Sequence, residues 1–257
     1  MPNSTPRRNA LDLVLRMAFT DLKLRYQGSV LGFLWTLLKP LMQFAVLYIV
    51  FSVFMRINVE NYQLYLLLGI LIWNYIAEGT THGMLALAQK ANIIKKVYFP
   101  RIFVVLSTSL HQLIALLLSL VVFFLFFFAS GQQLPWTGTL LLASLALLYA
   151  LVLGLSLILN VLYLKFRDTS QIWELLVMAG FFLSPVIYPL DVIPAQYHTL
   201  LFLNPVTGLI QYTRLALLHG ELPSLAGALY VTFCSVGILA LGLWLLRSIY
   251  ANQILLE

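Results

Sequence analysis

The chain has 257 residues, of which 61% are hydrophobic and only 9% charged, and its mean hydropathy is +0.94. A soluble domain carries about 25% charged residues, so this composition excludes a soluble enzyme, a nucleic-acid-binding protein and a disordered chain. The formal net charge of +6 is attributed to membrane orientation. A single cysteine, Cys234, excludes an intrachain disulfide and a cysteine metal cluster. We therefore expect an all-α integral membrane protein.

The N-terminal segment 1–33 lacks the long apolar core of a secretory signal. Leu11, Leu15, Ala18 and Leu22 recur at helical spacing, with charged side chains mostly elsewhere around the helix. This pattern predicts an amphipathic helix that lies in the cytoplasmic membrane interface.

Six apolar stretches follow, near the length of about 20 residues that crosses a bilayer core. They are Leu34–Met55, Tyr62–Leu85, Ile102–Ala129, Leu140–Leu164, Ile172–Tyr188 and Leu225–Leu246. All of the 15 Lys and Arg except Arg56 and Arg214 fall on one side of such a six-helix arrangement. The positive-inside rule then places both termini in the cytoplasm. We expect one domain over 1–257, with a bundle at 34–247 and a cytoplasmic tail at 248–257.

The fifth stretch differs from an ordinary span. Residues Ile172 to Ser184 would form a helix of only about 20 Å, and Pro185, Pro189 and Pro194 follow. A further apolar stretch, Leu200–Leu218, is interrupted by Asn204 and Pro205. Non-helical backbone at membrane depth must be buried in protein or line a water-filled cavity. We therefore expect a re-entrant hairpin in the outer half of the membrane after the fifth span, which indicates a transport pathway.

Few residues point to catalysis. Glu78 and His82 lie four residues apart on one helical face, and His111 lies in the third stretch. A metal or proton-relay site is one reading, and hydrogen bonding or an interfacial pair is the favoured one. Ser156 follows Gly154 as in a serine-nucleophile motif but has no evident base, so packing is favoured. The sequence contains no GxxxxGK[ST] phosphate loop, so an ATP-driven process would need a second polypeptide.

Several motifs occur together in a characteristic order. They are Asp21–Trp35 closing at Lys39-Pro40, Tyr65-Leu-Leu-Leu-Gly69, Asn92–Pro100, Phe166-Arg167-Asp168, Ser184-Pro185-Val-Ile-Tyr188 and Asn204-Pro205. In these motifs the chain resembles the polysaccharide-exporting class of ABC-transporter permeases, the type-2 permeases that export O-antigen, capsule and teichoic-acid polymers. The resemblance implies a homodimer with two copies of a cognate ATPase. It implies no cofactor on this chain, with ATP and Mg bound by the partner, and a place in the bacterial inner membrane.

The resemblance also assigns roles on the cytoplasmic side. The segment Asn92, Ile93, Ile94, Lys95, Lys96 resembles the coupling helix that contacts the ATPase, although an ordinary positive-inside loop has the same composition. Lys23, Arg25 and Lys39 are candidates for binding the phosphate of a lipid-linked glycan. Contact with bulk anionic membrane lipid explains these three residues equally well.

Two further sets of residues concern the pathway. Phe44, Tyr48, Phe51, Tyr62 and Tyr65 are candidate channel aromatics that stack against sugar rings, while helix packing or lipid contact is the simpler explanation. The segment after span five resembles an outer gate, with Asp191 expected to cap a turn. Its residues are Ser184, Pro185, Tyr188, Pro189 and Asp191.

Three alternatives to a polysaccharide exporter stay open. A type-2 ABC permease for a small apolar substrate, such as a drug or lipid, shares the architecture. A membrane-embedded enzyme of lipid-linked sugar metabolism requires paired acidic residues near a span end, where Asp168 and Glu174 are the nearest match. A passive channel requires no ATPase, and the resemblance speaks against it.

Overall fold

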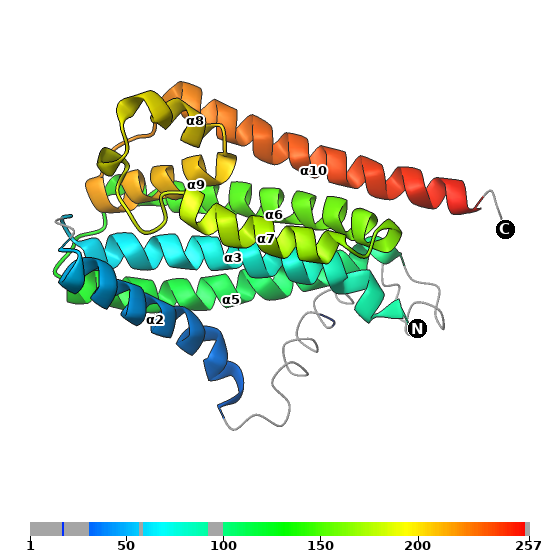
Figure 1. The fold of residues 1–257 in the computed structure, drawn as a ribbon, viewed down its shortest axis with the longest axis horizontal. Coiled ribbons are helices and arrows are strands. Elements are labelled where there is room, and N and C mark those ends of the chain that lie inside the picture. The colour runs from blue at the N-terminus through cyan, green and yellow to red at the C-terminus, as the bar shows by residue number, and fades with distance from the viewer. Residues whose placement is uncertain (1–16, 18–30, 57–58, 92–99, 255–257) are drawn as a thin grey trace, which may run out of the picture.

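The computed structural model describes residues 17, 31–56, 59–91 and 100–254. In this part of the chain the structure is helical and has no strand (Figure 1). The main helices are α2 (Trp35–Tyr48), α3 (Tyr62–Gln89), α5 (Arg101–Ala129), α6 (Leu140–Lys165), α7 (Thr169–Leu183), α8 (His198–Phe202), α9 (Pro205–Arg214) and α10 (Leu225–Ile254). Two π-helices, Ile49–Phe54 and Leu215–His219, continue α2 and α9. Short 3-10 turns are Gly32–Leu34, Trp136–Thr139, Leu190–Val192 and Ala195–Tyr197.

Five of the six predicted spans correspond to helices that are long and apolar enough to cross a membrane. They are Trp35–Phe54, Tyr62–Gln89, Arg101–Ala129, Trp136–Lys165 and Leu225–Ser248. The remaining predicted span, Ile172–Tyr188, corresponds to α7, which has 15 residues and a length of about 22 Å. An all-helical membrane bundle is thus confirmed, whereas a sixth full-length span is absent from the described residues.

Helix α3 lies at the centre of the bundle. Of its most apolar stretch, 78% is buried, whereas none of the corresponding stretch of α2 is. Figure 1 shows α3 between α2 on one side and α7 on the other, with α5 and α6 packed alongside. A residue of α3 therefore contacts other helices at almost every position, which makes α3 the element against which the others are placed.

Small residues bring α3 and α6 close together. A Cβ atom added at Gly79 would lie 2.7 Å from Val152 of α6, and one added at Gly83 would overlap Ser156 of the same helix. The Ser156 hydroxyl donates a hydrogen bond to the Gly79 carbonyl at 3.3 Å, and the Asn160 amide donates to the Met84 carbonyl at 2.9 Å. Close approach through glycine and serine is the usual way in which membrane helices associate, so Ser156 is a packing residue and not a nucleophile.

The helices divide the molecule into two ends (Figure 1). The basic end holds the α3 and α6 C-termini and the α5 and α7 N-termini, with Lys90, Arg101, Lys165 and Arg167 at or beside them. The loop end, opposite, holds the 184–224 segment that joins α7 to α10. This segment is compact, with α8, α9 and three short helical turns packed over the ends of the long helices.

Candidate functional site at the loop end

The chain leaves the α-helical conformation at Ser184, where α7 ends. Ser184 is extended, with φ −86° and ψ 141°, because the residue before a proline is disfavoured in the α region and Pro185 follows. We call residues Pro185–Tyr188 the clamp segment. Its Val186 and Ile187 side chains are at most 1% exposed, so this non-helical backbone is buried inside the protein.

Each carbonyl oxygen of the clamp segment accepts a hydrogen bond from a side chain of α3 or α9. The pairs are Arg214 to Pro185 at 2.6 Å, Arg214 to Val186 at 2.6 Å, Tyr62 to Ile187 at 2.9 Å and Tyr65 to Tyr188 at 3.1 Å. Inside a membrane, backbone polar groups must be satisfied by the protein itself. Side chains from two other helices therefore replace the hydrogen bonds that a longer α7 would supply.

Arg214 is the centre of this network. It is 1% exposed, and its guanidinium donates hydrogen bonds to the carbonyls of Tyr65, Pro185 and Val186 at 2.6 to 3.1 Å. The same group lies 3.5 Å from the centroid of the Tyr65 ring, which is a cation–π contact. One arginine thus joins α9, α3 and the clamp segment.

Gly69 of α3 leaves the space that the guanidinium occupies. A Cβ atom added at Gly69 would overlap Arg214 and lie 2.9 Å from the Val186 carbonyl oxygen. The Tyr65-Leu-Leu-Leu-Gly69 motif therefore supplies two parts of the site one turn apart on the same face. Tyr65 provides an aromatic ring under the guanidinium, and Gly69, which has no side chain, provides the space beside it.

The position of α9 is fixed at both ends. At its N-terminus the Asn204 side chain caps the helix by accepting from Val206 N at 3.1 Å and donates to the Ser184 hydroxyl at 3.1 Å. At its C-terminus the helix continues into the π-helix Leu215–His219, where the Ala216 carbonyl accepts from Thr137 at 2.7 Å. Arg214 thus lies where the helix changes from α to π geometry, a feature frequent at functional sites.

The predicted channel aromatics form a continuous row. Ring centroids are 5.6 Å apart for Phe44 and Tyr48, 6.2 Å for Tyr48 and Tyr62, and 6.3 Å for Tyr62 and Tyr65. The row runs from the half-buried α2 rings to the buried α3 rings, where it meets Arg214. Phe51 is partly buried against the same core. Within one copy of the chain, Tyr62 and Tyr65 thus serve as anchors of the clamp segment.

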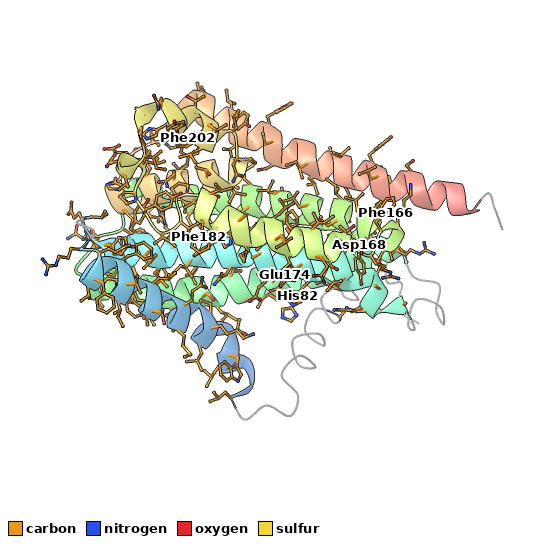
Figure 2. The ribbon with its side chains drawn as sticks, viewed as in Figure 1. His82, Phe166, Asp168, Glu174, Phe182 and Phe202 are labelled. Carbon is orange, nitrogen blue, oxygen red and sulfur yellow. The ribbon has the colours of Figure 1, made fainter. Side chains whose placement is uncertain are left out.

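The predicted gate residues divide into a buried and an exposed group. Ser184 and residues 185–187 are buried, while Tyr188 and Pro189 are half-buried, and the Tyr188 hydroxyl donates to the Phe182 carbonyl at 2.7 Å. Phe182 lies near the loop end of α7 in Figure 2. Asp191 is exposed within the turn Leu190–Val192, and neither this turn nor the next has a side-chain cap. The cap expected from Asp191 is therefore not formed, because Pro189 occupies the N-cap position.

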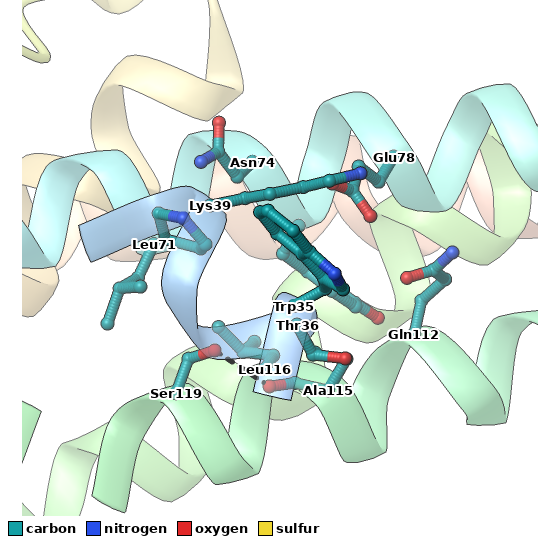
Figure 3. Close-up of a pocket in the computed structure, with 12 residues that line it drawn as sticks. Trp35, Thr36, Lys39, Leu71, Asn74, Glu78, Gln112, Ala115, Leu116 and Ser119 are labelled. Atoms are coloured by element: carbon teal, nitrogen blue, oxygen red, sulfur yellow. Dashed lines mark hydrogen bonds between the residues drawn. The ribbon is translucent and has the colours of Figure 1, made fainter. Parts of the chain in front are cut away.

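A small pocket with both polar and apolar lining residues lies nearer the basic end, between α2, α3 and α5. Its volume is about 40 Å³, enough to hold water. Figure 3 shows the Lys39 side chain extending from α2 toward Glu78 of α3, with Asn74 and Gln112 also lining the pocket. Glu78 is 11 residues before the end of α3 at Gln89, or about 16 Å along the helix. The structure thus places Lys39 as an exposed side chain at the edge of this pocket, away from the basic end itself.

The ionisable residues considered for catalysis do not assemble into a metal site. No group of three or more His, Cys, Asp or Glu that could hold a metal ion occurs among the described residues. His82 Nδ1 lies 2.6 Å from the Glu78 backbone oxygen, which is a contact within α3. Figure 2 places Asp168 at the start of α7 and Glu174 further along the same helix.

Several predicted residues lie outside the described part of the chain. They are the amphipathic helix around 11–22, apart from Met17, the cations Lys23 and Arg25, and the coupling residues Asn92, Ile93, Ile94, Lys95 and Lys96. Conversely, Arg214, Gly69 and Gln211, whose amide donates to the Pro185 carbonyl at 3.3 Å, belong to the loop-end site and were not predicted as site residues. The available signal was Arg214, an arginine in the apolar stretch Leu200–Leu218, since intramembrane charges are functional candidates.

Comparison with known proteins gives one family and several named relatives. The model of the family "ABC-2 type transporter" matches residues 13–218. An O-antigen export system permease protein RfbA of Klebsiella pneumoniae is 31% identical over 214 residues, covering 82% of each chain. The RfbA protein of Myxococcus xanthus is 29% identical over 243 residues, covering 94% of this chain and 92% of that one. The polysialic acid transport protein KpsM of Escherichia coli is 22% identical over 231 residues, covering 89% and 90%.

Proposed function

The chain belongs to the ABC-2 type transporter family, and from this we propose that it forms the channel of an ATP-driven exporter of lipid-linked cell-surface polysaccharide. The observation that carries the proposal is the near full-length similarity to permeases named for O-antigen export, at 29 to 31% identity. The family supplies transport components and not enzymes, in keeping with the absence of a phosphate loop from the sequence.

We infer a six-segment topology in the bacterial inner membrane. In it the basic end faces the cytoplasm, as the positive-inside rule requires, and the loop end faces outward. Helix α7 then crosses most of the bilayer, and the 184–224 segment forms the re-entrant hairpin. Burial of the clamp segment and side-chain bonding of its carbonyls support this placement, because these are the conditions for non-helical backbone at membrane depth.

We propose that two copies form the channel and that two copies of a cognate ATPase bind ATP and Mg beneath them. Large apolar side chains of α2, of the π-helix that continues it and of α7 support a partner there. Val46, Val53, Leu176, Met178 and Phe182 are all more than half exposed. Membrane lipid can also cover each of these side chains individually. A pathway for a polymer needs walls from both copies, and we assign these walls to α2 and α7.

We propose that each transport cycle starts at the ATPase. ATP binding brings the two ATPase copies together, and the segment Asn92–Lys96 transmits the movement to the walls. Lys23 and Arg25 receive the phosphate of the lipid carrier at the cytoplasmic surface, and Lys39, exposed on α2, continues this cationic series. The half-buried rings Phe44 and Tyr48 offer flat apolar faces on which sugar rings slide outward toward the gate at Ser184–Asp191.

Alanine substitution of Ile93 or Ile94 tests the coupling role. Each variant is expected to lose most of its export while the partner ATPase keeps hydrolysing ATP, because an apolar anchor is removed without changing the membrane bundle. The measurements are the amount of surface polysaccharide on the cells and the ATPase rate of the complex purified from the same cells. Leu142→Ala on α6, a side chain 74% exposed, is the matched control and should export normally. Unchanged export in both isoleucine variants would refute the assignment.

A further inference from the structure

We propose that Arg214 is the positioning residue that holds the clamp segment closed against α3, and that its release from the clamp carbonyls opens the loop end during transport. The proposal rests on the proposed exporter function and goes beyond it by assigning the closed state to one side chain. Arg214 of α9 was predicted neither as a channel residue nor as a gate residue, but it contacts Tyr65 and the clamp segment.

The contacts of Arg214 are of an unusual kind for a buried charge. They are three backbone carbonyls and one aromatic ring, and no carboxylate pairs with it in the described part of the chain. A buried charge is expensive unless it is paired and hydrogen-bonded. In this structure the carbonyls of Tyr65, Pro185 and Val186 surround one guanidinium. The charge therefore favours this one arrangement of α3, α9 and the clamp segment.

The same contacts are suited to being broken and remade. The clamp segment is attached by side-chain donors, namely Arg214, Gln211, Tyr62 and Tyr65, and not by a helix or sheet that would have to unfold. Water entering from the loop end can form hydrogen bonds with each released donor and each released carbonyl, as it does with exposed groups. The clamp segment can thus leave α3 while the long helices stay packed.

The chain on both sides of the contact allows such a movement. Arg214 is followed by the π-helix Leu215–His219, and Gly220 ends this helix with φ +70°. On the other side the clamp segment begins with Pro185 and is followed by Pro189, and both prolines prevent helical continuation. The clamp segment on one side of the contact and the π-helix after Arg214 on the other thus both lack regular α-helical hydrogen bonding.

Thiol labelling tests the closed state directly. In a Cys234→Ser background, a single cysteine replaces Ile187, which is 1% exposed, and a membrane-impermeant maleimide is applied from the loop-end side. We expect slow labelling with Arg214 present and about tenfold faster labelling in Arg214→Gln. Arg214→Lys should be intermediate, because lysine keeps the charge but loses the planar fork that reaches several carbonyls.

Two control cysteines separate local release from unfolding. Leu151 on α6 is 1% exposed, and Leu151→Cys should stay protected in every Arg214 variant. Val192 is 66% exposed, and Val192→Cys should react in all of them. Ile187→Cys remaining protected in Arg214→Gln would overturn the proposal. So would joint exposure of Ile187→Cys and Leu151→Cys, which would mean that Arg214 stabilises the whole bundle. Full protection by Arg214→Lys would contradict the role of the fork.

Labelling during turnover distinguishes a gate from a static brace. With the cognate ATPase and lipid-linked glycan present, Ile187→Cys in the protein that keeps Arg214 should react faster when ATP is added. Continued protection while export proceeds would show a brace and overturn the gating role. Failure of export itself would count against the proposed function and leave the Arg214→Gln comparison standing, since that comparison needs neither ATPase nor substrate.

Discussion

Gly69→Ala is expected to lower export about tenfold while the protein stays folded and in the membrane. The new Cβ atom would overlap the Arg214 guanidinium and approach the Val186 carbonyl at 2.9 Å. Overpacking of this kind costs about 1–3 kcal/mol. Arg214 or the clamp segment has to shift, because α3 is held on all sides. The measurement is surface polysaccharide normalised to the amount of protein in the membrane.

Gly237→Ala is the matched control for this substitution. Gly237 lies in α10, and an added Cβ atom meets nothing within 4 Å, so the change tests helix propensity alone, which favours alanine by about 1 kcal/mol. Gly237→Ala should export at the wild-type rate. Wild-type export by Gly69→Ala as well would mean that the contact between Gly69 and Arg214 has no bearing on transport.

Gly154→Ala is expected to lower the stability of the protein, whereas the molecules that stay folded should transport normally. The added Cβ atom would lie 2.6 to 2.7 Å from backbone atoms of Ile238 and Leu239 in α10, and a helix backbone cannot move aside as a side chain can. Separation of α6 and α10 would forfeit the most extensive contact between helices in the bundle. A cost of about 2–3 kcal/mol corresponds to a fall in the melting temperature of about 5–10 °C.

Thermal unfolding of the detergent-purified protein measures this effect, again beside Gly237→Ala. The two glycine variants should differ in export per folded protein, which falls in Gly69→Ala and stays at the wild-type value in Gly154→Ala. A melting temperature of Gly154→Ala equal to that of the wild type would refute the close approach of α6 to α10.

The long helices were predictable because membrane spans leave a strong signal. The predicted start at Tyr62 and the predicted ends at Ala129 and near Lys165 agree with the structure. Length and apolar composition suffice for such helices, since the bilayer fixes both. The break after α7 was also visible, because a proline two residues beyond Leu183 ends the helix for local steric reasons.

The loop-end site was only partly predictable. Tyr62, Tyr65 and Ser184 were singled out, but their contacts were not, because the atoms that join them are backbone carbonyls. Every residue has a carbonyl, so the sequence carries no mark of the ones that Arg214 binds. Arg214 was visible only as a charge on the outer side. Its partners depend on how α9 folds back onto α3, 149 residues away in the chain.

Aromatic spacing was similarly ambiguous. The helical spacing of Phe44, Tyr48 and Phe51 predicts that they share a face of α2, and the structure places all three against the core in part. Spacing does not tell a sugar-lined face from a packed one, because both need the same side chains at the same period. The row of rings from Phe44 to Tyr65 emerges only when α2 and α3 are placed together.

Co-purification followed by an ATPase assay tests the central claim most directly. The full chain is expressed with the genes for candidate ATPases, purified from detergent, and assayed with and without lipid-linked glycan. We predict a stoichiometric complex with an ATPase whose turnover changes when the glycan-lipid is added. A chain that purifies without an ATPase, or a complex whose ATPase activity is indifferent to glycan-lipid, would contradict the exporter account.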